Sequence, residues 1–96
     1  MSIYLVAQIN IEDRDTYARY EAGFMEIFDR YDGELLAVDE AVTELEGSWD
    51  YTRTVILRFP DETAARSWYD SAEYQALAQH RFAASAANLA IVQGMD

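Results

Sequence analysis

Residues 54–74 read TVILRFPDETAARSWYDSAEY, and this stretch decides the fold. Residues 54–59 are rich in β-branched and aromatic side chains, which favour a strand. Pro60 ends that strand because proline has no N–H to donate to a sheet ladder. Asp61 then offers a side-chain oxygen to the open N–H groups of a helix that begins at Glu62. The stretch therefore predicts a strand that runs directly into a helix.

The predicted helix carries Ala64, Ala65 and Trp68 at helical spacing, so this face turns inward. Ser71 is a second N-cap, and we expect the helix to bend there and to restart. The restarted helix is predicted to run to about Ala87. A strand followed by such an interrupted helix is half of a βαβ unit.

The upstream residues predict two further strands and another helix. Residues 3–10 (IYLVAQIN) have the pattern of a strand with apolar side chains on both faces, which indicates that both faces are covered. Residues 14–31 show tyrosine and phenylalanine at helical spacing after an N-cap at Asp13. Residues 34–39 (ELLAVD) predict a short strand, and residues 42–46 are expected to fold back beside it.

A loop over residues 47–51 should expose Trp49, and residues 89–93 (LAIVQ) predict the last strand. The order of elements is then βαββαβ, which is typical of a ferredoxin-like α+β domain with a four-stranded antiparallel sheet. Both helical regions would cover one face of the sheet, in one domain of residues 1–96. The other face is too apolar to stay wet, so we expect a homodimer through this open face.

Composition excludes several kinds of chemistry. The 96 residues include no cysteine, so disulfides, thiol nucleophiles and thiolate metal sites are excluded. All seven basic residues are arginines, which rules out Schiff-base and phosphate-binding lysines. The formal net charge of −11 disfavours nucleic acid and anionic membrane surfaces as partners. No secretory leader or membrane-length apolar run is visible, so we expect a cytoplasmic protein.

Several segments together resemble one family. They are YLVAQI, DRDTYARY, YDGELLAV, LEGSW, RTVILRFPDETAARSWYDSAEYQAL, an arginine at position 81, and AIVQG. The chain is similar to a domain-of-unknown-function family in the dimeric α/β-barrel superfamily, over nearly its whole length. Where relatives often have proline after the helix-capping aspartate, this chain has Arg14, which affects the cap and no site. The resemblance implies a dimeric ferredoxin-like fold.

For function, the resemblance implies a choice among activities and not one reaction. Members of the superfamily include cofactor-independent monooxygenases, muconolactone isomerase-like enzymes and chlorite dismutase-like haem proteins, and a fold alone does not select among them. If the chain is an enzyme, we expect a cofactor-independent isomerase or a monooxygenase-like activity. No metal or nucleotide cofactor is expected, because a dinucleotide fingerprint and a multi-histidine set are both absent.

Arg81 is the most informative candidate, because it falls in the middle of the inward stripe of its helix, between Tyr74 and Ser85. A buried guanidinium needs a partner. One interpretation is a structural ion pair with a carboxylate such as Glu21, or hydrogen bonds to backbone carbonyls. The other is an anchor for a ligand carboxylate or enolate oxygen. His80, the only histidine, is a candidate general acid or base but also fits a half-exposed surface position.

The predicted ligand-binding residues are Tyr17, Tyr20, Trp68, Tyr74, Arg81 and Ser85. The aromatic side chains among them also fit an ordinary core, although inward hydroxyls need hydrogen-bond partners, which a ligand or water could supply. The acids Asp39, Glu40, Glu44 and Glu46 are interpreted as a solvated edge-protecting surface and not as a metal site.

Two functional classes follow. One is a small-molecule binder or enzyme with an aromatic pocket anchored by Arg81. The other is a non-catalytic dimeric module for assembly or partner binding, with Arg81 in an ion pair.

Overall fold

The computed structural model describes residues 1–96 as four strands and three helices. In chain order these are β1 (Ile3–Ile11), α1 (Arg14–Phe28), β2 (Glu34–Asp39), β3 (Arg53–Phe59), α2 (Glu62–Tyr69), α3 (Ala72–Ala84) and β4 (Ser85–Gln93). The strands form one antiparallel sheet in the order β2-β3-β1-β4. This is the predicted ferredoxin-like βαββαβ arrangement, with the second helical region divided into α2 and α3. None of the helices is long and apolar enough to span a membrane.

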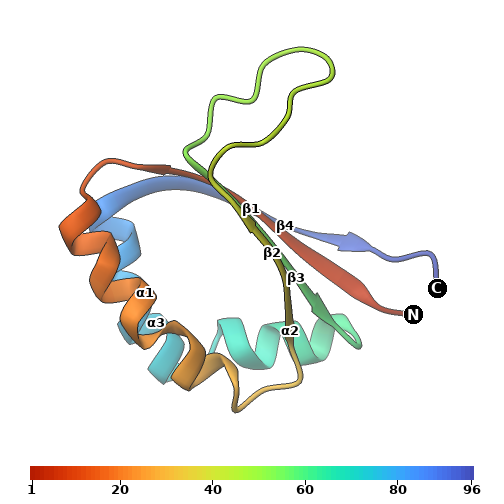
Figure 1. Cartoon of the computed structure of the whole chain (residues 1–96). Helices are drawn as coiled ribbons and strands as arrows, with labels where there is room; N and C mark the ends of the chain where they lie inside the picture. The colour runs from red at the N-terminus through yellow and green to blue at the C-terminus, as the bar shows by residue number, and fades with distance from the viewer.

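All three helices lie on one side of the curved sheet, and both termini lie at the same end of the molecule (Figure 1). The other side of the sheet carries no helix (Figure 1). Alternation along β1 produces this difference, because Ile3, Leu5, Ala7 and Ile9 are buried beneath the helices while the residues between them are half-buried. The hydrophobic core therefore lies between the sheet and the helices.

The three predicted N-caps are confirmed. The side chain of Asp13 accepts a hydrogen bond from Thr16 N, and that of Asp61 accepts one from Ala64 N. Ser71 does the same for α3, with its Oγ 3.1 Å from Tyr74 N. The helix after Pro60 thus ends at Tyr69, and a new helix begins at Ala72, as the sequence predicts.

Two predicted boundaries are wrong. The first helix ends at Phe28 and not at Tyr31. The backbone N–H groups of Arg30 and Tyr31 donate to the carbonyl three residues earlier and not four, as where Tyr31 N donates to Phe28 O at 3.0 Å. The second wrong boundary lies between α3 and β4: the helix ends at Ala84 and not near Ala87, and the strand predicted from Leu89 begins at Ser85, four residues earlier. The small residues of this segment suit a helix by propensity, but their backbone pairs with β1, as in Ser85 with Ile11.

Residues 42–46 do not fold back as a strand, so that prediction is also wrong. They belong to a loop that projects from the sheet between β2 and β3 (Figure 1). Side chains satisfy part of its backbone, as where Glu44 accepts from Trp49 N at 2.6 Å. Trp49 is 40% exposed, and its Nε1 donates to Thr54 Oγ1 at 2.9 Å.

Gly33, just before β2, packs against one ring from α1 and one from β3. A Cβ at this position would lie 2.5 Å from Phe28 Cζ and 2.7 Å from Phe59 Cε1, and both rings are fully buried. We expect Gly33→Ala to destabilise the fold by about 1 to 3 kcal/mol, because rings in a packed core cannot move aside freely. Urea denaturation measures this loss.

The matched control is Gly47→Asn. Gly47 has a φ of 70° and no atom near its missing Cβ, and asparagine tolerates this backbone conformation. An unchanged urea midpoint for Gly33→Ala would contradict the packing argument.

Candidate functional site

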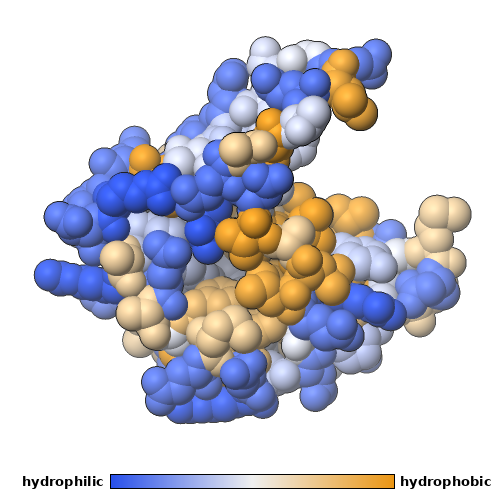
Figure 2. Space-filling model, viewed as in Figure 1, coloured by the Kyte–Doolittle hydropathy of each residue, from blue (hydrophilic) through white to orange (hydrophobic).

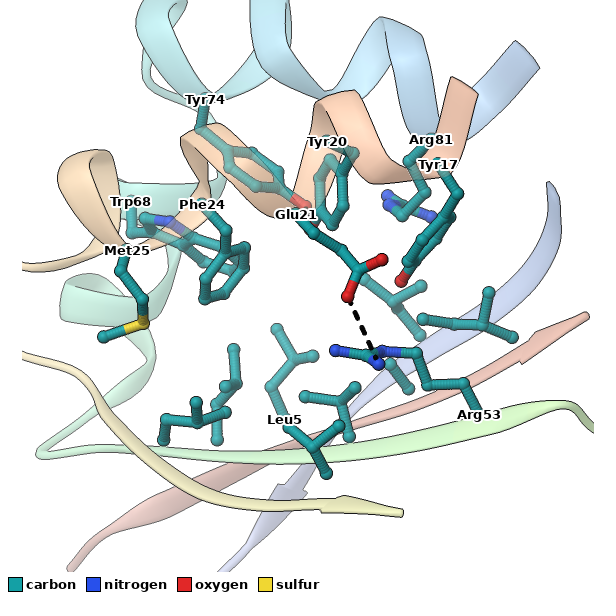
Figure 3. Close-up of a pocket in the computed structure, with 17 residues that line it drawn as sticks. Leu5, Tyr17, Tyr20, Glu21, Phe24, Met25, Arg53, Trp68, Tyr74 and Arg81 are labelled. Carbon is teal, nitrogen blue, oxygen red and sulfur yellow. Dashed lines mark hydrogen bonds and ion pairs between the residues drawn. The ribbon is translucent and has the colours of Figure 1, made fainter. Parts of the chain in front are cut away.

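A cavity of about 160 Å³ lies between the helices and the sheet. It is lined by 17 residues, of which only Glu21, Arg53 and Arg81 carry a formal charge (Figure 3). A cavity of about 150 Å³ in another protein holds benzene. The space is therefore large enough for one ring or a short chain.

Aromatic side chains from all three helices form the roof of the cavity. Tyr17, Tyr20 and Phe24 come from α1, where spacings of three and four residues place them on one face. Their rings follow one another with centroids 5.5 and 5.7 Å apart. Trp68 of α2 and Tyr74 of α3 continue the roof, with centroids 4.2 Å apart.

Aliphatic side chains of the sheet form the floor. They come from the inward positions of β1, β3 and β4: Leu5, Ala7, Ile9, Val55, Leu57 and Leu89. The rim is also apolar, because Met25, Leu35 and Val38 line the cavity and are each 41 to 42% exposed. Figure 2 shows hydrophobic residues gathered over the gap between sheet and helices. An apolar molecule can thus reach the cavity from solvent.

Two tyrosine hydroxyls meet inside the roof. Tyr20 and Tyr74 are buried, and their hydroxyl oxygens are 2.7 Å apart. Burial raises the pKa of both phenols, that of Tyr20 well above its usual value. Both therefore stay protonated at neutral pH, and one hydroxyl donates to the other while the proton of the second is free to point elsewhere.

Arg81 lies in the last turn of α3 and is only 4% exposed. The ion pair with Glu21 suggested by the sequence is not formed, because Glu21 instead lies 3.5 Å from Arg53 (Figure 3). Arg81 is in none of the ion pairs of the structure. Its guanidinium lies over the rings of Tyr20 and Phe82, at 5.7 and 4.9 Å. Aromatic faces stabilise this charge, but no carboxylate neutralises it.

Three buried side-chain nitrogens have no hydrogen-bond partner: Nε of Arg53, Nε1 of Trp68 and Nε of Arg81. All three residues line the cavity. Each of these nitrogens is a donor, and unpartnered buried donors are costly and uncommon. Three lining residues therefore each carry a buried donor for which the protein itself supplies no acceptor.

Five of the predicted ligand-binding residues come together in the cavity: Tyr17, Tyr20, Trp68, Tyr74 and Arg81. Ser85 does not line it. Its Oγ instead donates to the backbone oxygen of Arg81 at 2.7 Å, where α3 ends. His80 is half-buried on α3 and is also outside the cavity lining.

The sequence analysis missed Arg53 as a cavity residue. The signal was available, because Arg53 alternates with Val55 and Leu57 and so shares the inward face of β3. Arg53 is held by Glu40, at 2.9 Å, which also forms two hydrogen bonds with Arg14. Glu40, one of the four predicted surface acids, thus connects the first residue of β3 to the first residue of α1. No cluster of three acidic or histidine side chains is arranged to hold a metal ion.

The fold and cavity define a ferredoxin-like α+β protein with a pocket between its helices and its sheet. The chain belongs to the family described as domain of unknown function DUF1330, whose model matches residues 2–95. No curated protein matches the chain in sequence.

Solved structures with this fold include proteins of unknown function and one oxygenase. The protein RPA0582 from Rhodopseudomonas palustris, of unknown function, is 18% identical, with a TM-score of 0.83 over 99% of this chain and 83% of that one. SnoaB from Streptomyces nogalater, a cofactor-independent oxygenase, is 14% identical, with a TM-score of 0.73 over 99% and 94% of the two chains. A dimeric ferredoxin-like protein of unknown function from Jannaschia sp. CCS1 is also 14% identical, with a TM-score of 0.72 over 98% and 100%. At these identities the similarity shows the fold alone.

The tyrosine pair allows a direct test of the roof. Tyr74→Phe leaves the buried Tyr20 hydroxyl without its partner, so we expect a loss of about 1 to 3 kcal/mol in the free energy of unfolding. The double variant Tyr20→Phe, Tyr74→Phe removes both hydroxyls and should recover most of that loss. Urea denaturation of the two single variants and the double variant gives the coupling energy. Strictly additive losses would show that the hydroxyls do not interact.

Proposed function

We propose that the protein binds a small organic molecule with hydrogen-bond acceptors in the cavity between its helices and its sheet. The observation that carries this proposal is the set of unpartnered donors on Arg53, Trp68 and Arg81, all of which line that cavity. A ligand that brings acceptor oxygens, together with a rotation of these side chains toward it, would remove the cost of the unmade hydrogen bonds. The apolar floor and aromatic roof would bury the rest of the molecule.

Arg81 is the proposed anchor. Arg81 has no carboxylate partner, whereas Arg14, Arg30, Arg53 and Arg66 are each in an ion pair. Its planar guanidinium suits a carboxylate or enolate oxygen. The proposed binding residues are therefore Tyr17, Tyr20, Trp68, Tyr74 and Arg81. Ser85 and His80 are not included because neither lines the cavity.

If the protein is an enzyme, the donor set supports one kind of catalysis. Donors fixed in a largely apolar cavity stabilise negative charge that develops on a ligand oxygen, as in the enolate of an isomerisation or of an oxygenation. SnoaB, which shares the fold, is a cofactor-independent oxygenase. That similarity favours an isomerase or monooxygenase-like activity over hydrolysis, for which no nucleophile and base are placed together in the cavity.

Arg81→Met tests the anchor. Methionine keeps an apolar stem and removes a buried charge that has no carboxylate partner, so we expect a melting temperature equal to or above that of the native protein. Ligands from a metabolite library that raise the melting temperature of the native protein should not raise that of the variant. Differential scanning fluorimetry gives both readings.

The control for this test is Arg66→Met, which removes an exposed arginine paired only with Glu62 of the same helix. It should retain ligand binding. A loss of about 3 to 5 kcal/mol in Arg81→Met, as large as the cost of breaking a buried pair, would instead show that Arg81 is structural.

We also propose a homodimer formed through the helix-free face of the sheet. Cross-strand partners on this face include Val6 with Ile56 and Ala90, and Tyr4 with Val92. Val92 is 49% exposed, so apolar surface of this face is open to solvent. The structural relatives described as dimeric, from Jannaschia and Thermobifida fusca among others, support this assembly. Assembly without ligand binding is thus the second candidate function of the chain.

Val92→Glu should dissociate the proposed dimer, because it places a charge in an apolar interface without disturbing the core of one chain. Light scattering at micromolar concentration should give a dimer mass for the native protein and a monomer mass for the variant. Ala76→Glu, an exposed position on α3, is the control and should remain dimeric. A native protein that scatters as a stable monomer would refute the assembly.

A further inference from the structure

The cavity lining has more basic than acidic side chains, whereas the whole chain has more acidic than basic ones. The sequence has 18 acidic residues and 7 arginines, with a formal net charge of −11. The cavity lining has two of those arginines, Arg53 and Arg81, and a single acid, Glu21. The lining of this acidic protein's cavity therefore has a formal charge of +1, and Glu40, outside the lining, lies 2.9 Å from Arg53. Anions are concentrated in such a site, because low-dielectric walls focus its field.

Both guanidinium groups lie at the Tyr17 end of the cavity. The Arg53 guanidinium carbon is 5.7 Å from the centre of the Tyr17 ring, and that of Arg81 is 5.7 Å from the ring of Tyr20, one turn further along α1. Figure 3 shows the Tyr17 hydroxyl pointing toward the sheet, with Arg81 beside its ring and Arg53 on the sheet side. Burial raises the pKa of Tyr17, and the nearby charges of Arg53 and Arg81 oppose that rise. Its hydroxyl stays protonated at neutral pH and can donate.

We propose that the ligand is a carboxylate of about one ring, with its anionic group held at the Tyr17 end by Arg81 and Arg53 and its ring beneath the aromatic roof. This inference rests on the proposed function and specifies its ligand. Carboxylates match the planar guanidinium fork, and both arginines line the cavity. The cavity volume of about 160 Å³ sets the size, since a cavity of about 150 Å³ accommodates benzene.

Arg53 is the less obvious member of this site. It has two acidic neighbours, Glu40 at 2.9 Å and Glu21 at 3.5 Å. Glu40 is also bound by Arg14, so it fixes the position of Arg53 and only shares its charge. Glu21 is the longer contact and is itself part of the lining. A bound carboxylate would take the place of Glu21 as the second partner of Arg53.

The test compares benzoate with benzamide, which has nearly the same shape and no charge. Isothermal titration calorimetry of the native protein should give at least about a tenfold lower Kd for benzoate, with concentrations of up to about 10 mM to reach weak binding. The difference should disappear in Arg81→Met and shrink in Arg53→Lys, which keeps the charge near Glu40 but removes the planar fork. Tyr17→Phe should weaken benzoate more than benzamide, and Arg66→Met should change neither.

Each other outcome overturns the inference in a distinct way. Equal affinities for benzoate and benzamide would keep the pocket but refute an anionic ligand. Benzoate binding that survives Arg81→Met would place it outside this site. If neither compound binds, the benzoate-sized carboxylate is refuted. The proposed function would then stand or fall with the library screen, in which a hit lost in Arg81→Met would retain it.

Discussion

The packing around Trp68 is the interaction on which the rest of the structure depends. Its ring contacts Phe28 of α1, Phe59 of β3 and Tyr74 of α3, with centroids 4.2 to 5.8 Å apart. Aromatic pairs in these geometries stabilise a fold beyond the area they bury. One side chain thus joins all three helices to the sheet, because it lies itself on α2. The same ring forms part of the cavity roof, so the core and the candidate site share a wall.

The cavity is costly for a domain of this size. A chain of 96 residues buries a limited core, and native domains are typically stable by only about 5 to 15 kcal/mol. Filling the space near Arg81 with apolar side chains would be expected to stabilise the fold, since a buried charge without a carboxylate partner gives up hydration for weaker contacts with rings. Stability sacrificed at one place is typical of a functional site. The energetic argument therefore supports a ligand independently of any relative.

Most of the fold could be predicted because its signals are local. N-caps at Asp13, Asp61 and Ser71 and the alternating pattern of β1 depend on neighbouring residues only. The errors fall where distant partners decide. Residues 85–88 become strand because β1 offers its edge, and residues 42–46 stay a loop although their own pattern allows a strand. For the site, the inward position of Arg81 followed from helical spacing. The absence of an ion pair with Glu21 could not be predicted, because the sequence cannot show that Glu21 contacts Arg53 and not Arg81.

The two proposed activities use opposite sides of the same sheet. Inward residues of β1 and β3 line the cavity, and the residues between them form the helix-free face. Because side chains alternate along a strand, the dimer interface and the ligand site can change almost independently in sequence. A change at one site could affect the other through the shared sheet. It could also do so through Arg53 at the start of β3, next to Thr54, which the loop residue Trp49 contacts. A dimer would therefore stabilise the sheet that forms the cavity floor without supplying residues to the cavity. Ligand binding should therefore depend on Arg53 and Arg81, and dimer formation should depend on the apolar residues of the helix-free face.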